Sequence, residues 1–204
     1  PVITFAVLAL ALLLAACSSS SPVGVARVDP SAVHERLTRS ALSARYLSSP
    51  SYNVLLEADL DALYEKDPEK ALERLHDLAV SGSGGPRQLF AAAEASFLHA
   101  ERTGKRQYFL AAALYAWAYL FPEDPSEAPS PFDPRFRLAA NLYNRGLTST
   151  LEGSKNGQVV LSAGTLDLPF GQLEVTFDDT QLTWRNRRMT AFAPIAEYRV
   201  FGLQ

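Results

Sequence analysis

The chain has 204 residues, of which 48% are hydrophobic, and a formal net charge of −3 at pH 7. This length and composition suit one globular domain or two small ones with a sizeable core, and the negative charge argues against a nucleic-acid partner. Because Cys17 is the only cysteine, a disulfide framework and a cysteine-based metal site are excluded. Stability must therefore come from packing.

The first element is an apolar run from Val2 to Ala16, interrupted only by Thr4. It is shorter than the ~20 apolar residues that a membrane-spanning helix needs, and it ends in small residues, as the hydrophobic part of a secretory signal does. The sequence Leu14-Ala15-Ala16-Cys17, followed by four serines, resembles the lipobox of bacterial lipoproteins. The resemblance implies that residues 1–16 are a signal peptide and that Cys17 is acylated. The alternative is an ordinary secretory signal that leaves Cys17 unmodified.

Lipidation would place the protein in the bacterial cell envelope. Ser18 after the cysteine resembles an outer-membrane sorting signal, so we expect a lipid anchor in the outer membrane, with residues 17–28 as the lipidated cysteine and its Ser/Pro/Gly-rich tether. Each buried CH₂ of an acyl chain contributes about 0.8 kcal/mol to anchoring. The sequence begins at Pro1 without a basic segment, and we therefore expect it to be truncated at this end.

Residues 29–152 are expected to form a helical domain. Three expected helix starts share an Asp-Pro pair, in which the aspartate can accept hydrogen bonds from the first turn and the proline has no N–H to lose. After each start the apolar residues recur at helical spacing. The starts are Asp29-Pro30, Asp67-Pro68 and Asp133-Pro134, and the stripes are Val33, Leu37 and Ala41; Ala71, Leu72, Leu75, Leu78 and Ala79; and Phe136, Ala139, Ala140, Tyr143 and Leu147.

Further helices are expected around Tyr52–Glu65, Arg87–Arg102 and Arg106–Phe121, separated by glycine- and proline-rich segments. The stretch Tyr108–Phe121 carries no charge, so we expect this helix to be buried centrally. We interpret its six aromatic residues as core, with a groove for a lipid or peptide as the alternative. Together these patterns predict an irregular helical bundle with tetratricopeptide-like helix pairs, although no fixed sequence period is present.

In residues 153–204 the hydrophobic residues recur at every second position instead of at helical spacing. Leu173, Val175 and Phe177 alternate with polar residues, and turn signals include Gly164-Thr165 and Pro169-Phe170-Gly171. This pattern predicts a small antiparallel β region and an α+β fold class. Val159, Leu161, Leu182–Trp184 and Tyr198–Val200 extend the strand-like pattern. Because it continues to the end of the sequence, we expect a C-terminal domain to follow.

The sequence contains no recognisable catalytic set. A serine-hydrolase elbow needs G-x-S-x-G, which neither Ser83 nor Ser162 satisfies. His34, His76 and His99 lack a second histidine at metal-binding spacing, so we interpret them as ordinary surface or half-buried histidines. We therefore expect no catalytic, cofactor-binding or metal-binding residue and no cofactor. The predicted site residue is Cys17, for lipidation.

A basic cluster of Arg185, Arg187 and Arg188 lies beside Trp184. It could contact anionic lipid headgroups or a phosphate. The favoured interpretation is an exposed turn or edge strand whose charges prevent aggregation, because three charges are few for strong binding to a membrane surface.

Eight segments of the chain form a recognisable series: residues 22–25, 28–30, 33–38, 96–102, 115–122, 132–139, 143–147 and 168–171. Their order resembles the N-terminal region of large bacterial lipoproteins that carry an α/β-hydrolase domain downstream. The resemblance covers nearly all of the chain after the signal and includes no catalytic motif. It implies an esterase- or lipase-like serine hydrolase in the intact gene product, with its nucleophile outside this chain.

The sequence therefore leaves two functions open. The first is a membrane-anchored accessory region whose partners are the lipid bilayer and the C-terminal hydrolase domain of the same gene product. The second is a non-enzymatic outer-membrane lipoprotein whose helical array binds a peptide or an assembly partner. A downstream reading frame with a G-x-S-x-G elbow would favour the first function.

Overall fold

The structure is a computed structural model that describes residues 28–81, 84–151, 163–176, 180, 183–185 and 187–188. The predicted lipidation site Cys17 lies outside these residues, as do the strand candidates around Val159 and Tyr198. The chain divides after Val33 into two compact units. The described part of the first unit is the start of helix α2 (Pro30–Thr38), where Asp29 Oδ1 accepts a hydrogen bond of 3.1 Å from the Ser31 N–H.

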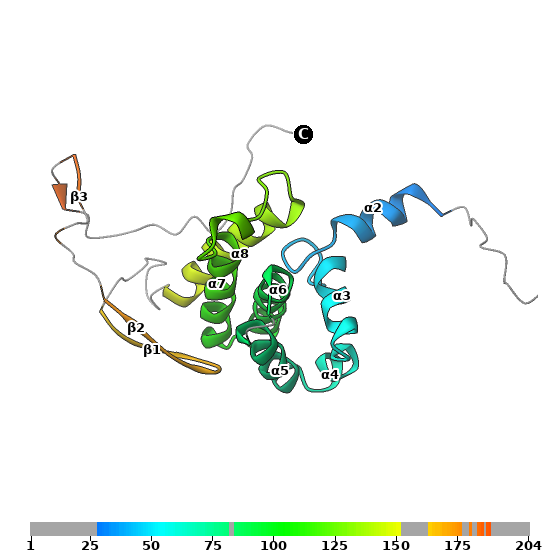
Figure 1. Cartoon of the computed structure of the whole chain (residues 1–204), viewed down its shortest axis with the longest axis horizontal. Coiled ribbons are helices and arrows are strands. Elements are labelled where there is room, and N and C mark those ends of the chain that lie inside the picture. Colours follow the sequence, from blue (N-terminus) through cyan, green and yellow to red (C-terminus); the bar gives the residue numbers. More distant parts are fainter. Residues whose placement is uncertain are drawn as a thin grey trace, which may run out of the picture. The chain divides into compact units, whose positions relative to one another are not determined.

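The second unit, residues 34–204, contains the remaining described helices (Figure 1). The described helices come first in the chain and the described β strands follow them, so the α+β class expected from the sequence is confirmed. In chain order they are α3 (Ser49–Glu57), α4 (Asp61–Lys66), α5 (Pro68–Val80), α6 (Pro86–Thr103), α7 (Arg106–Leu120), the 3₁₀ turn η1 (Pro125–Glu127) and α8 (Pro134–Leu151).

The predicted Asp-Pro helix starts are confirmed. Helices α5 and α8 begin at the expected prolines, and Asp67 accepts a hydrogen bond from the Lys70 N–H at 3.2 Å. Asp133 accepts one from the Arg135 N–H at 2.8 Å. Helix α6 ends at Gly104, which has a φ of 71°, a conformation that glycine adopts without steric cost.

The single helix predicted over Tyr52–Glu65 is wrong. Asp59 adopts a φ of 53° and separates α3 from α4. The Leu60 N–H donates to the Leu55 oxygen and the Asp59 N–H to the Leu56 oxygen, which is the pattern of a helix C-terminal Schellman turn. Burial of Leu60, which is 2% exposed, fixes this break.

The first predicted stripe also needs correction. Helix α2 ends at Thr38, so Ala41 lies beyond it in a turn and is buried, whereas Val33 is exposed. Val33 and Ala41 therefore do not share one helix face. The three serines that follow α2 in this region, Ser40, Ser43 and Ser48, favour turns and caps over a continued helix.

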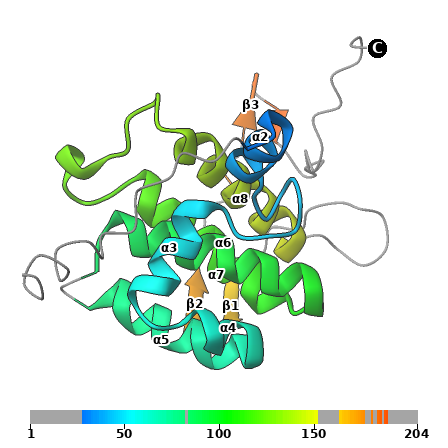
Figure 2. The same ribbon diagram turned by 90° about the vertical axis from the view of Figure 1, so that its right-hand side faces the viewer.

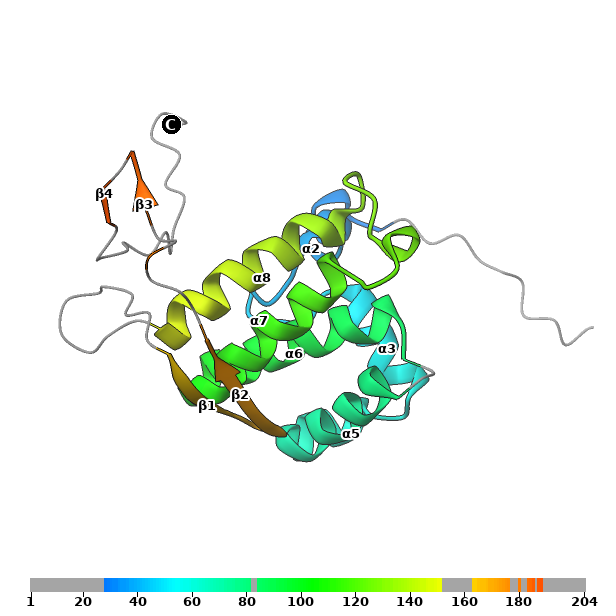
Figure 3. The same cartoon turned by 60° about the vertical axis from the view of Figure 1, so that its left-hand side comes forward.

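Helix α6 is the central helix of the described bundle. It contacts α3, α5, α7 and α8, and every residue from Phe90 to Ala100 is buried. Figure 3 shows α6, α7 and α8 running side by side. The helix with the charge-free stretch Tyr108–Phe121, α7, was expected in this place, but its Trp117 is 49% exposed. Figure 2 shows the same bundle from the side of α3.

Small residues allow the helices to approach closely. The alanines of α6 and all alanines of α7 except the half-buried Ala118 are buried, and Gly146 of α8 faces α7. A Cβ on Gly146 would lie 2.7 Å from the Phe109 carbonyl oxygen and 3.1 Å from the Ala113 Cβ. Hence α7 and α8 are in contact at a distance that only glycine permits at this position.

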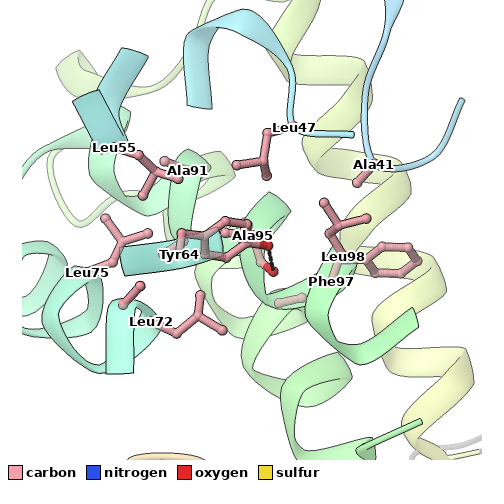
Figure 4. Close-up of a cluster of buried hydrophobic side chains, with 14 of the residues drawn as sticks. Ala41, Leu47, Leu55, Tyr64, Leu72, Leu75, Ala91, Ala95, Phe97 and Leu98 are labelled. Atoms are coloured by element: carbon pink, nitrogen blue, oxygen red, sulfur yellow. Dashed lines mark hydrogen bonds between the residues drawn. The ribbon is translucent and has the colours of Figure 1, made fainter. Parts of the chain in front are cut away.

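A hydrophobic cluster fills the space between α3, α4, α5 and α6 (Figure 4). The Tyr64 hydroxyl donates to the Ala95 carbonyl oxygen at 3.0 Å, so the polar end of this buried ring is satisfied. The cluster includes Ala41, Leu47, Leu55, Tyr64, Leu72, Leu75, Ala91, Ala95, Phe97 and Leu98.

Two short hairpins follow the helices. Strands β1 (Gly164–Leu168) and β2 (Gly171–Val175) pair antiparallel with Leu166 opposite Leu173, and β3 (Thr183–Trp184) pairs with β4 (Arg187–Arg188). On β2, Leu173 and Val175 are half-buried while Gln172 and Glu174 are exposed, which confirms the alternation predicted for these two residues; Phe177 lies outside the described residues. Gly164, predicted in a turn, is instead the first residue of β1, and β1 contacts α7.

Candidate functional site

The turn of the β1–β2 hairpin packs against the helices. The Phe170 ring stacks on the His76 ring of α5 with a centroid distance of 4.9 Å and an angle of 22° between the planes. On the other side it meets the edge of Tyr108 of α7 at 6.4 Å. The His76 Nδ1 forms a hydrogen bond of 2.7 Å with the Tyr115 hydroxyl. We call these four residues the hairpin contact.

The sequence explains how the four side chains meet. Tyr108 and Tyr115 are seven residues apart on α7, so they lie two turns apart on one face. Pro169 and Phe170 form the turn between β1 and β2, so Phe170 lies at the end of the hairpin. Burial raises the pKa of the Tyr115 hydroxyl above its usual range, so this group stays a neutral hydrogen-bonding phenol at physiological pH.

A second histidine lies next to the hairpin contact. The buried His99 ring meets the Tyr108 ring edge-on at 4.5 Å, and its Nε2 is 3.3 Å from Glu69 Oε1. Glu69 also forms an ion pair with Lys105. Desolvation lowers the pKa of His99, while burial, with the charge and hydrogen bonding of Glu69, raises the pKa of Tyr108 to about 12.

These contacts give the two histidines structural roles. A serine hydrolase needs a histidine that takes a proton from a serine hydroxyl, but His76 is bonded to a phenol and His99 lies against a carboxylate. His34 is exposed on α2. Within the described ranges, no group of three or more His, Cys, Asp or Glu side chains could hold a metal ion. Around Phe170 the contacts are ring packing and the hydrogen bond between His76 and Tyr115.

The buried carboxylate of Glu94 was missed by the sequence analysis. Glu94 Oε1 accepts from the Ala41 N–H at 2.9 Å, and Oε2 accepts from the Ser48 N–H at 3.1 Å and from the hydroxyls of Ser48 and Ser51 at 2.6 Å each. The Glu94 carboxyl group therefore lies at the start of α3 and accepts hydrogen bonds from its Ser48 cap and from Ser51 in its first turn. The Ser48-Ser49-Pro50-Ser51 segment could have indicated a helix start, but no local signal points to Glu94.

The remaining predicted groups are placed as follows. Arg185 lies in the turn between β3 and β4 with a φ of 50°, and it is exposed together with Arg187, which agrees with the turn interpretation. Arg188 lies on β4. Ser83 and Ser162 are outside the described part of the chain.

The aromatic residues of the α7 region divide into two groups. Tyr108 and Tyr119 are buried, as the core interpretation requires. Trp117 and Phe121 are exposed and lie against each other with ring centroids 6.1 Å apart. The interpretation of the whole set as core is therefore too broad.

Comparison with known proteins gives no relative of this chain: no family model, curated protein or solved structure matches it. The function must therefore be argued from the residues themselves. Among the described helices, none is long and apolar enough to cross a membrane.

Proposed function

We propose that this chain is a membrane-anchored accessory region of a bacterial envelope hydrolase. Cys17 carries the lipid anchor, the helical unit is a non-catalytic scaffold, and an esterase- or lipase-like domain of the same gene product performs the chemistry. The proposal combines the lipobox, the resemblance given by the sequence segments and the contacts of the described residues.

The observation that carries the proposal is the hairpin contact. An anchor by itself needs only a flexible tether, but here the β hairpin is held on the helices by a stacked Phe170–His76 pair and by Tyr108. A scaffold that fixes a β element in this way can also fix the orientation of a domain attached to it. This is the property expected of an accessory region.

The polar groups support a scaffold rather than an enzyme. Glu94 accepts four hydrogen bonds from the segment 41–51, and buried polar groups of this kind stabilise one arrangement of a core. His76 is hydrogen-bonded to the Tyr115 hydroxyl, and the His99 ring packs edge-on against Tyr108. Both histidines thus take part in the packing between helices.

Hydrolysis of short acyl esters tests the proposal. The 204-residue chain should show no turnover above a buffer control, whereas the intact gene product should hydrolyse the ester through a serine outside this chain. Phe170→Ala removes a half-buried ring, which costs on the order of 1–2 kcal/mol, and should lower the temperature at which the intact enzyme loses activity. Gln172→Ala, at an exposed position of the same hairpin, is the matched control.

Two results would contradict the proposal. Serine-dependent turnover by the chain alone would place an active site within these residues. An intact gene product without hydrolase activity would favour the non-enzymatic lipoprotein that binds a peptide or an assembly partner.

A further inference from the structure

Three large aromatic side chains are exposed at one corner of the bundle. Trp117 and Phe121, at the end of α7, are 49% and 59% exposed, and Phe132, just before α8, is 94% exposed. Gly146, near the end of α8, faces Phe109, near the start of α7, so the two helices run antiparallel (Figure 3). The end of α7 therefore lies beside the start of α8. We call Trp117, Phe121 and Phe132 the aromatic corner.

The exposed rings continue an apolar face of α7. Four apolar residues recur at the spacing of one helix face, namely Leu114, Trp117, Ala118 and Phe121. Leu114 and Ala118 are half-buried, and the rings of Trp117 and Phe121 lie against each other with centroids 6.1 Å apart. The stretch Tyr108–Phe121 carries no charge, so none of its side chains would have to give up the hydration of a charge against an apolar surface. Contiguous exposed apolar groups of this kind mark a contact surface, unlike single ones.

Acylation of Cys17, which belongs to the proposed function, would keep this corner within reach of a bilayer. The segment from Cys17 to His34, the first residue of the second unit, spans at most about 60 Å, at about 3.5 Å per residue. A folded unit of about 100 residues has a radius of gyration of about 13 Å. The length of the tether therefore allows any face of the helical unit to meet the lipid, and the chemistry of the faces decides which one does.

The side chains of the aromatic corner suit the interface of a bilayer. Tryptophan is enriched at the level of the headgroups, because its ring is apolar and its N–H is polar. Helices that lie in this interface turn tryptophan, phenylalanine and leucine toward the acyl chains. A contact that is weak by itself becomes effective when an anchor already holds the chain at the surface, because the second contact is then intramolecular. The bilayer is also the apolar surface that the anchor itself holds close.

The charges near the corner indicate the kind of lipid. Asp133 is paired with Arg135 at 2.6 Å. The exposed charged residues between Trp117 and the first turn of α8 are mostly acidic, namely Glu123, Asp124, Glu127 and Arg137. Anionic headgroups attract basic segments and would repel this one. We infer that the aromatic corner inserts shallowly into the headgroup region of a zwitterionic bilayer, as a second contact that rests on the Cys17 anchor of the proposed function.

Quenching of tryptophan fluorescence by brominated lipid tests the inference. The chain has two tryptophans, so Trp184→Phe leaves Trp117 as the only reporter in the acylated chain, reconstituted into phosphatidylcholine vesicles. Bromine on the acyl chains should quench the emission of Trp117. The matched control carries Gln107→Trp together with Trp117→Phe and Trp184→Phe. Its reporter occupies an exposed position about 15 Å away along α7 and should keep most of its emission. Added phosphatidylglycerol should not increase the quenching of Trp117.

Three results would overturn the inference: equal quenching of the two reporters, stronger quenching of Trp117 with phosphatidylglycerol, or a Trp117 shielded from aqueous acrylamide but not quenched by brominated lipid. In the last case a protein surface covers the corner. The emission of the unchanged chain minus that of Trp117→Phe isolates Trp117 without altering Trp184, so the test does not depend on one variant. Palmitate labelling separates the two proposals. An unquenched Trp117 in a labelled chain overturns this inference alone, whereas a chain without label has no anchor and overturns both.

Discussion

Replacement of Glu94 should have a larger effect on stability than replacement of any exposed acidic residue. The carboxylate is 0% exposed, and it joins α6 to residues that precede it by 43 to 53 positions in the sequence. Two of its four donors are backbone N–H groups, of Ala41 and Ser48. These cannot turn toward another acceptor, whereas the Ser48 and Ser51 hydroxyls already lie 3.4 Å apart and can pair with each other.

The two oxygens of Glu94 allow the cost to be estimated. In Glu94→Gln one oxygen becomes an NH₂ donor, so whichever way the amide is turned, either the Ala41 or the Ser48 N–H loses its acceptor. A buried unsatisfied donor costs about 1–3 kcal/mol. In Glu94→Ala both N–H groups lose their acceptor and a cavity is left, so we expect a loss of about 3–6 kcal/mol.

Urea unfolding followed by circular dichroism measures both losses. Glu101→Gln, at an exposed position of the same helix, should stay within about 0.5 kcal/mol of the unchanged chain. A Glu94→Gln variant that is as stable as the Glu101→Gln control would refute the account of Glu94 as the acceptor that holds the segment 41–51. A larger loss of stability in Glu94→Gln than in Glu94→Ala would refute it as well.

Three further predictions concern the bundle. Gly146→Ala should lower stability by about 1–3 kcal/mol in thermal unfolding, because its Cβ would collide with α7. Gly→Ala in a helix usually raises the melting temperature, and such a rise here would contradict the close contact. Ala112→Asp places an unpaired charge at a 0% exposed position and should lower the free energy of unfolding by several kcal/mol. The control Gln107→Asp changes an exposed position on the same helix, α7. Equal melting temperatures of these two variants would show that α7 is not packed as described. The pKa of His99 is lower in the folded chain than its ordinary value of 6.5. As the pH falls below 6.5, His99 is therefore protonated in the unfolded chain before it is protonated in the folded chain, and the free energy of unfolding should fall. Urea unfolding of His99→Gln at several pH values should lack this loss of stability.

The helix starts could be predicted from sequence because their chemistry is local. Asp67 and Asp133 act on N–H groups two or three residues away, so the pattern and its effect lie in the same short segment. The alternation of Leu173 and Val175 with polar residues is similarly short in range and is found on β2.

The features that were missed depend on contacts over long distances in the sequence. Glu94 finds its donors at Ala41, Ser48 and Ser51, and Phe170 finds His76; no periodicity carries this information. Asp59 breaks the predicted helix because Leu60 is buried, which is a tertiary effect that overrides helical spacing. The central place of α6 was missed as well, because the charge-free stretch Tyr108–Phe121 was expected at the centre, whereas the burial of Phe90 to Ala100 depends on contacts with four other helices.

The membrane anchor at Cys17 is the central claim of the account, and metabolic labelling of bacterial cells with radioactive palmitate tests it most directly. The account predicts that the label enters the protein, that Cys17→Ser abolishes it, and that the neighbouring control Ser18→Ala retains it. Label that persists in Cys17→Ser, or a protein that never takes up palmitate, would contradict the claim.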